Sequence, residues 1–210
     1  MSYKIFWMNF HAGDTLMKID NSDYYHNNRT YYKLFTETKS SRYVSFFYPV
    51  KDQIISLVDK ETFFPYKYDK DLNEGNYREK DIIIFDHINE TALSDNKNHK
   101  IPKGVHDPFS AIYFFRSLTL EVGKDVYFNM FDGSKVIKLV IKILKKEKIS
   151  VPAGVFNTIK IEPVVSGTKG LFKHKGNLYV WVTDDEKKIP VLIESGVLIG
   201  AVSVKLVEYK

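Results

Sequence analysis

Two pairs of neighbouring side chains are the residues of this sequence that could carry acid–base chemistry. Asp184 and Asp185 are adjacent carboxylates, and His106 precedes Asp107. A carboxylate pair must converge on one substrate bond to act as acid and base. Neighbouring side chains of an extended chain point to opposite faces, so we expect Asp184 and Asp185 to shape a turn. His106 and Asp107 could form a base and its orienting carboxylate, but Pro108 follows directly, which favours a helix cap at Asp107.

The sequence contains no pattern for a metal, a cofactor or an activated nucleophile. Cysteine is absent, which excludes thiolate metal sites and a cysteine nucleophile. No Gly-x-Ser-x-Gly occurs, and the segment from Gly196 to Gly200 has no lysine to complete a phosphate loop. The histidines show no His-x-x-x-His spacing, and they are His11, His26, His87, His99, His106 and His174. We therefore expect no metal, no cofactor and no enzymatic activity.

The charge of the chain does not indicate a nucleic-acid partner. The formal net charge is +5, but only four of the 31 basic residues are arginine, the side chain best suited to phosphate and guanine. No apolar run approaches the ~18 residues that a membrane helix needs, so we expect no transmembrane segment.

One lysine-rich segment shows where much of the charge lies. From residue 136 to 146, apolar and basic side chains alternate, which predicts a strand with one face on a core and one in water. The apolar positions are Ile137, Leu139, Ile141 and Ile143, and the lysines are Lys138, Lys142 and Lys146. We expect a solvated strand face; the alternative is a binding patch for an anionic lipid or polymer.

The aromatic content points to a sheet. Phe, Tyr and Trp make up 15% of the chain, and many lie in the first seventy residues among threonine, serine and lysine, as in half-buried strands. Residues 12–14 are expected to end the first strand, residues 31–48 to stay strand-like with a polar interruption at residues 38–42, and residues 89–104 to form an exposed connection. Residues 126–209 are expected to form antiparallel hairpins. The predicted fold is one mainly β domain over residues 1–210, a long twisted antiparallel sheet that curls into a half or nearly closed barrel.

A change of period predicts one main α-helix at about residues 107–118, packed on this sheet. One apolar stripe follows helical spacing, and a second apolar face lies beside it and ends at Arg116. The stripe is Ala111, Phe114, Phe115 and Leu118, and the second face is Phe109, Ile112 and Tyr113. A helix that is apolar nearly all round must be covered on both sides. The sheet covers one side; a loop, a second sheet, a partner or a ligand must cover the other.

Several segments together resemble the bacterial exported-protein family catalogued as domain of unknown function 3108. The carboxyl half contains GVHDPFSAIYFFR at 104–116, VPAGVFNTIKIEP at 151–163, and YVWVTDD at 179–185 followed by IPV at 189–191. The amino half contributes Phe6-Trp7, YPVKD at 48–52, Glu74-Gly75 and Phe85-Asp86. The resemblance implies a periplasmic or outer cell-envelope location, with a secretion leader removed. The architecture is more loosely similar to periplasmic lipoprotein carriers.

These expectations combine into a binding protein of the cell envelope. We predict that an apolar or lipid-like ligand lies between the sheet and the helix, lined by Phe109, Ile112, Tyr113 and Trp181, with Arg116 near the mouth. One alternative is a structural or adaptor module with a filled core and an envelope protein as partner. A less favoured alternative is a hydrolase of envelope polymers that uses Asp184, Asp185 or His106, which requires two of these side chains to meet at one cleft.

Overall fold

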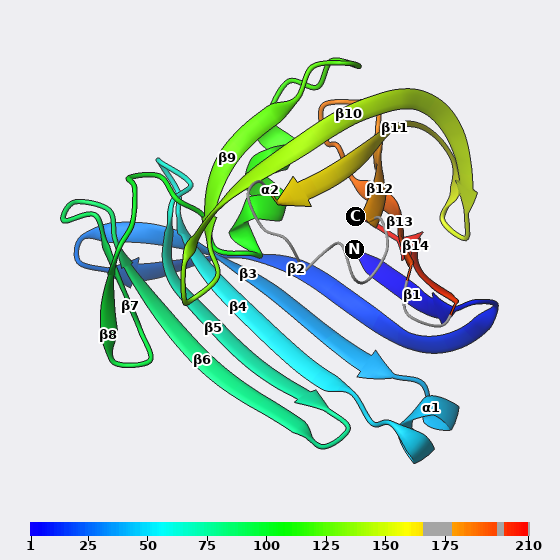
Figure 1. The fold of residues 1–210 in the computed structure, drawn as a ribbon, viewed down its shortest axis with the longest axis horizontal. Helices are drawn as coiled ribbons and strands as arrows, with labels where there is room; N and C mark the ends of the chain where they lie inside the picture. The colour runs from blue at the N-terminus through cyan, green and yellow to red at the C-terminus, as the bar shows by residue number, and fades with distance from the viewer. Residues whose placement is uncertain (166–177, 197–199, 210) are drawn as a thin grey trace. The chain divides into compact units, whose positions relative to one another are not determined.

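The computed structural model describes residues 1–165, 178–196 and 200–209. Strands dominate these residues, with two short helices (Figure 1). The strands are β1 (Ser2–Trp7), β2 (Phe10–His26), β3 (Arg29–Ser40), β4 (Lys51–Asp59), β5 (Pro65–Glu74), β6 (Tyr77–Asp86), β7 (Thr91–Ser94), β8 (Lys97–Lys100), β9 (Val126–Phe131), β10 (Val136–Val151), β11 (Gly154–Val165), β12 (Leu178–Thr183), β13 (Pro190–Gly196) and β14 (Ala201–Glu208), and the helices are α1 (Arg42–Phe47) and α2 (Ser110–Ser117).

The described strands form one antiparallel sheet in which neighbours along the chain are mostly neighbours in the sheet. The strand order is β8-β7-β6-β5-β4-β3-β2-β1-β14-β13-β12-β11-β10-β9. Among the described strands, only the β1–β14 pair joins strands that are distant in sequence, through a register such as Ile5 opposite Val204. The predicted mainly β class, with a long antiparallel sheet and one main helix, is confirmed.

Contacts within the chain group it into two compact units. Unit 1 comprises residues 1–15, 116–128 and 138–210, and unit 2 comprises residues 16–115 and 129–137. Most of the meander from β2 to β8 and the first six residues of α2 belong to unit 2, whereas β11 to β14 belong to unit 1. The single domain expected over residues 1–210 stays a prediction.

The core of unit 2 is organised by rows of side chains that cross the strands. One row runs from Leu34 on β3 through Ser56 on β4 and Tyr68 on β5 to Ile83 on β6, and all four side chains are buried. Because alternate residues of a strand share one face, this register fixes which face of the meander is the core. It also places the Ser56 hydroxyl inside that core, where it needs a polar partner.

The segment before α2 supplies this partner. The helix itself spans Ser110–Ser117, shorter at both ends than the expected 107–118, because Asp107, Pro108 and Phe109 form the turn that precedes it. The predicted cap is confirmed, since the Asp107 carboxylate accepts from the backbone N–H groups of Phe109 and Ser110. The cap thus anchors α2 within unit 2.

Three local expectations in the amino half are wrong. The first turn lies at Met8, whose φ of 53° is left-handed, and residues 12–14 continue β2. Residues 42–47, within the stretch expected to be strand-like, form α1. Residues 89–104 contain the β7–β8 hairpin, turned by Asp95 and Asn96 with φ of 47° and 57°. Two consecutive left-handed residues match the twist of a two-residue hairpin turn. This polar segment therefore forms a regular β-hairpin.

The carboxyl half contains the predicted hairpins, of which β11 to β14 lie in unit 1 and the β9–β10 turn in unit 2, with one irregularity in β10. Ile137, Ile141 and Ile143 are buried as expected and Lys138 is exposed. The β10–β11 register shifts between Ile143 and Lys145, which changes the phase of the alternation. Lys146 therefore does not continue the row of Lys138 and Lys142; its ammonium pairs with Asp184 at 2.8 Å. Residues 197–199, part of the segment expected to form hairpins, lie outside the described residues.

Candidate functional site

Three of the five predicted ligand-lining residues lie on or directly before α2 in unit 2. Phe109 and Tyr113 are buried, 4% and 6% exposed, with ring centroids 5.5 Å apart in an edge-to-face arrangement. Ile112 lies between them in sequence and is 39% exposed. In the first apolar stripe, Ala111 and Phe115 are buried, and Phe114 and Leu118 are half-buried. The second face is therefore covered at Phe109 and Tyr113 and open at Ile112.

The other two predicted lining residues, Arg116 and Trp181, belong to unit 1. The Arg116 Nε donates to the carbonyl of Lys187 at 2.9 Å. Trp181 is buried, its indole N–H donates to Glu147 Oε1 at 2.8 Å, and the Lys160 ammonium lies 4.6 Å from its ring centre. Both side chains thus have structural partners in their own unit. The grouping of all five residues around one ligand stays a prediction.

A buried polar cluster precedes α2. Asp107 Oδ1 accepts from the N–H groups of Phe109 and Ser110, each at 2.7 Å, and Oδ2 accepts from the Ser56 hydroxyl at 2.6 Å. Burial raises the pKa of Asp107, and the hydrogen bonds from Ser56 and Ser110 only partly oppose it. The carboxyl group is fully enclosed. The Asp107 carboxyl group therefore caps α2 and accepts a hydrogen bond from Ser56.

His106 is a core imidazole. It is 1% exposed, its ring stacks on Phe114 with centroids 4.2 Å apart, and its Nδ1 lies 3.4 Å from the Ser110 hydroxyl. Burial lowers the pKa of His106 to about 4, so the neutral ring predominates at neutral pH. A general base must lie within hydrogen-bond reach of a substrate proton. Enclosure of this ring gives a polymer no access to it.

Asp185 has the turn chemistry expected for it, whereas the Asp184 carboxylate has a different partner. Asp185 Oδ1 accepts from the Thr183 hydroxyl and from the N–H groups of Lys187 and Lys188, at 2.7 to 3.0 Å. The prediction for Asp185 is therefore confirmed. Asp184 instead pairs with Lys146 on β10. The two carboxylates serve different partners rather than one substrate bond.

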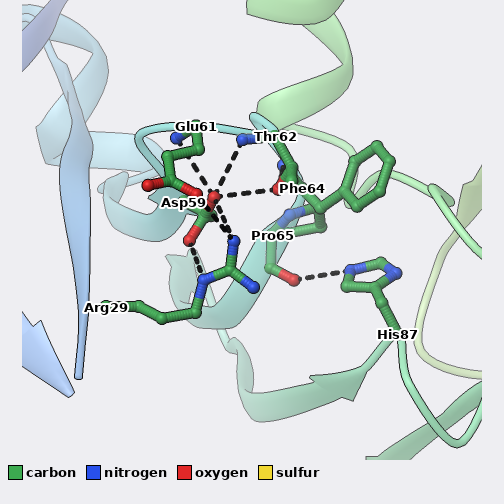
Figure 2. Close-up of polar contacts among 7 residues, drawn as sticks. All are labelled: Arg29, Asp59, Glu61, Thr62, Phe64, Pro65 and His87. Carbon is green, nitrogen blue, oxygen red and sulfur yellow. Dashed lines mark hydrogen bonds and ion pairs between the residues drawn. The ribbon is translucent and has the colours of Figure 1, made fainter. Parts of the chain in front are cut away.

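Asp59 is the hub of the β4–β5 turn in unit 2 (Figure 2). Its carboxylate accepts from Arg29 Nε at 2.6 Å, and its Oδ1 accepts from the Glu61 and Thr62 N–H groups and the Thr62 hydroxyl. Burial alone would raise the pKa of Asp59, but the hydrogen bonds from Thr62 and Arg29 outweigh it and lower the pKa. These hydrogen bonds give Asp59 a structural role in the turn.

His87 closes the neighbouring connection in the same close-up. Its Nε2 lies 2.8 Å from the Pro65 carbonyl (Figure 2). Its Nδ1 accepts from the Gly104 N–H at 3.3 Å. With these partners the Nε2 carries the proton and the ring is neutral. Burial lowers the pKa of His87 accordingly. Protonation of Nδ1 would remove the acceptor for Gly104.

Removal of the Asp59 carboxylate should destabilise the chain. Asp59→Ala leaves the turn N–H groups without their acceptor and Arg29 without its partner, so we expect a loss of about 2–3 kcal/mol in the free energy of unfolding. Asp71→Ala is the matched control, because the half-buried Asp71 pairs with the exposed Lys80 and accepts from Asn73, and ion pairs open to solvent contribute at most about 1 kcal/mol. Urea denaturation of both variants measures the difference. Equal losses would contradict the role of Asp59 as a hub.

The most exposed aromatic side chains of unit 2 lie on and beside α1, where the sequence analysis expected a strand. We call Tyr43, Phe46, Phe47 and Tyr48 the aromatic tip; the first three are 86%, 83% and 84% exposed. Figure 1 shows α1 at the end of the long strands β3 and β4. The signal for a helix here is Ser41, whose hydroxyl accepts from the Val44 N–H.

Two grooves open on the surface of unit 2. One of about 350 Å³ borders the segment that follows α1 and is lined by Pro49, Val50, Lys51, Gln53, Asp71, Asn73 and Arg78. The second, of about 880 Å³, lies along β6 to β8 and the β9–β10 turn, with Ile82, Ile84 and Leu93 among acidic, basic and amide side chains. Within the described ranges, no three His, Asp or Glu side chains are arranged to hold a metal ion. His174 lies outside those ranges.

The described helices are too short and too polar for any of them to cross a membrane.

The fold defines a mainly antiparallel β protein with one main helix. The family described as "Protein of unknown function (DUF3108)" matches residues 2–207, and the chain belongs to this family. No curated protein matches the sequence. A crystal structure of a β-barrel-like protein of domain of unknown function DUF1849 from Brucella abortus is similar, with a TM-score of 0.58 and 8% identity over 99% of this chain and 95% of that chain. This likeness supports the fold.

Two further solved structures align over all of this chain and 93% of their own. One is a Bacteroides fragilis protein provisionally described as exported, with a YmcC-like fold, at 10% identity and a TM-score of 0.42. The other is a Parabacteroides distasonis protein provisionally described as a lipoprotein, at 11% identity and a TM-score of 0.39.

Proposed function

We propose that this chain is a non-enzymatic binding protein for an apolar or lipid-like ligand. The observation that carries the proposal is the partial exposure of Ile112 on α2, between the buried Phe109 and Tyr113. Complete burial of an exposed aliphatic side chain gains about 1.5–3 kcal/mol, and Ile112, which is 39% exposed, has part of that gain still to make. A helix that is apolar on two faces and open at one residue offers an apolar ligand a place to contact it.

The structural roles of the polar residues support binding over catalysis. His106 and Asp107 are enclosed in unit 2, and Asp185 is committed to its turn. An active site needs a nucleophile, acid or base at an accessible cleft with correctly placed partners. A binding site for an apolar ligand needs mainly apolar lining with a few polar groups. Phe109, Ile112 and Tyr113 fit that description.

We further propose a location in the cell envelope. The support is the resemblance of the sequence to an exported-protein family. Fractionation of the native cells, with an antibody against this chain, tests the location. Recovery with the periplasm or the outer envelope is expected, and recovery with the cytoplasm would contradict it.

A change at Ile112 should weaken binding of an acyl probe. Ile112→Glu places a charge where the apolar ligand is expected to lie, so we expect at least about tenfold weaker binding of a fluorescent fatty acid. Ile88→Glu is the matched control, because Ile88 is an exposed aliphatic residue of the same unit outside α2. Fluorescence titration measures both affinities.

Native mass spectrometry of protein purified from a bacterial host is the independent test. A co-purifying lipid that is lost in Ile112→Glu and retained in Ile88→Glu would support the site. Wild-type protein that binds neither a lipid nor the probe would overturn the proposal. That outcome would favour a structural or adaptor module with a filled core, for which a partner could be sought by pull-down from envelope extract.

A further inference from the structure

Three rings of the aromatic tip, Tyr43, Phe46 and Phe47, form an exposed apolar surface, and the fourth, Tyr48, packs on Gly75. Within the described part of unit 2, none of the side chains of α1 is buried. Tyr43, Phe46 and Phe47 each expose more than four fifths of their surface. Soluble proteins seldom expose clustered apolar side chains without an interaction that uses them.

The spacing of these residues gathers them on one side of the helix. Tyr43, Phe46 and Phe47 stand at positions i, i+3 and i+4, which are neighbours on a helical surface. The rings of Phe46 and Phe47 are 4.9 Å apart in an edge-to-face arrangement. The tip therefore presents one aromatic face rather than scattered rings.

The helix that carries this face is fixed to the end of the meander. The Ser40 hydroxyl accepts from the Val50 N–H at 2.8 Å, and the Pro49 carbonyl accepts from the Gly75 N–H at 2.8 Å. The Tyr48 ring covers Gly75, where a Cβ would lie 2.5 Å from a ring carbon and where φ is +56°. Glycine at 75 allows the β5–β6 turn to approach α1 this closely. Hydrogen bonds of the residues before and after α1 therefore fix the position of the helix that carries the exposed aromatic face.

Near the tip the acidic residues Glu37, Asp52 and Glu74 are half-buried, whereas the basic residues Lys39, Arg42 and Lys51 are exposed. Lys39, Arg42 and Lys51 are the only charged residues from 39 to 51. Lys39 pairs with Glu37, whereas Arg42 and Lys51 are exposed beside the aromatic face. The nearby groove of about 350 Å³ adds Arg78 together with one acidic residue, Asp71. Aromatic side chains next to basic ones complement a surface that has an apolar interior beneath an anionic outer layer.

We propose that the aromatic tip docks on a lipid bilayer that contains anionic headgroups. Phe46 and Phe47 enter the boundary between headgroups and acyl chains, and the tyrosine rings lie at headgroup depth, where amphipathic aromatic rings are favoured. Arg42 and Lys51 face the lipid phosphates. The inference does not depend on the ligand proposed for α2, because the two surfaces share no residue.

The charges favour a bilayer over a second copy of this chain. Self-association through the tip would bring Arg42 and Lys51 of two copies together, and like charges at one contact repel. An anionic bilayer has the opposite charge and needs no groove of matching shape. Occupation of the tip by a second copy is accordingly the competing outcome of the experiment.

Vesicle sedimentation with the full chain tests the docking. Wild-type protein should sediment with vesicles of phosphatidylglycerol and phosphatidylcholine, bind less to phosphatidylcholine alone, and lose binding as salt is added. Phe46→Ser combined with Phe47→Ser should reduce binding at least about tenfold. The matched control is Tyr24→Ser with Tyr25→Ser, because these are exposed aromatic neighbours of the same unit. The control pair should leave binding unchanged.

Insertion can be observed directly because the chain has no cysteine. Phe46→Cys, labelled with a polarity-sensitive dye, should shift its emission to the blue when anionic vesicles are added, and labelled Ile88→Cys should not shift. Wild-type protein that stays in the supernatant, or equal loss in both serine pairs, would overturn the proposal. A blue shift without vesicles that grows with protein concentration would also overturn it, in favour of a second copy at the tip.

Discussion

Asp107→Ala should cost about 3 kcal/mol of the free energy of unfolding. The substitution removes the acceptor for the first N–H groups of α2, and loss of a helix cap alone costs about 1 kcal/mol. It also leaves the buried Ser56 hydroxyl without the carboxylate 2.6 Å away, which adds about 1–3 kcal/mol. Urea denaturation at neutral pH, followed by circular dichroism, measures the change.

Two matched variants identify the cause of this loss. Asp107→Asn keeps an acceptor for the backbone and a polar partner for Ser56, so it should cost less than about 1 kcal/mol. Asp86→Ala removes a carboxylate that accepts from the N–H groups of Ile88 and Asn89 at an exposed turn. Water can replace that acceptor, so the loss should be smaller than at Asp107. If Asp86→Ala and Asp107→Ala cost the same, burial of the cap is not what makes Asp107 important.

Asp107 also shows what could be predicted from sequence. The Asp-Pro pair has a local mechanism, and the cap was correctly predicted from two residues. Its link to Ser56 could not be, because that contact joins residues 51 positions apart. It depends on the register that places Ser56 beside Leu34 and Tyr68. Local signals in the sequence predicted the helix cap, whereas its contact with Ser56 is determined by the register of the sheet.

The same distinction explains the missed elements of unit 2. The β7–β8 hairpin is made of polar residues, so its strands give no apolar alternation; the available signal was Asp95-Asn96, two residues that tolerate a left-handed backbone. At α1 the aromatic run suggested a strand by propensity. Aromatic propensity for strands reflects packing on a half-buried surface, and this run is exposed. The aromatic residues that form the candidate docking surface are therefore the same residues that led to the wrong prediction of a strand.

Mild acid should destabilise the chain through His106. Its pKa falls from an ordinary 6.5 to about 4 on folding, because the ring is buried. Between these values the unfolded chain binds a proton that the folded chain does not, so stability is retained above pH 6.5 and lost as the pH falls toward 4. The loss approaches about 1.4 kcal/mol for each pH unit, about 3 kcal/mol in all. The lowered pKa of His87 adds to it with the same sign.

A substitution at His106 isolates its share of this pH dependence. His106→Gln cannot be protonated in this range, so its free energy of unfolding should fall less than that of wild type between pH 6.5 and 4.5, measured by urea denaturation at each pH. The lowered pKa of His87 destabilises both wild type and variant as the pH falls, and the raised pKa of Asp107 stabilises both. Neither is therefore expected to cause a difference between the two chains in how the free energy of unfolding changes with pH. Parallel curves would mean that His106 is protonated in the folded chain, and the enclosed neutral ring that argues against a catalytic base would then be wrong.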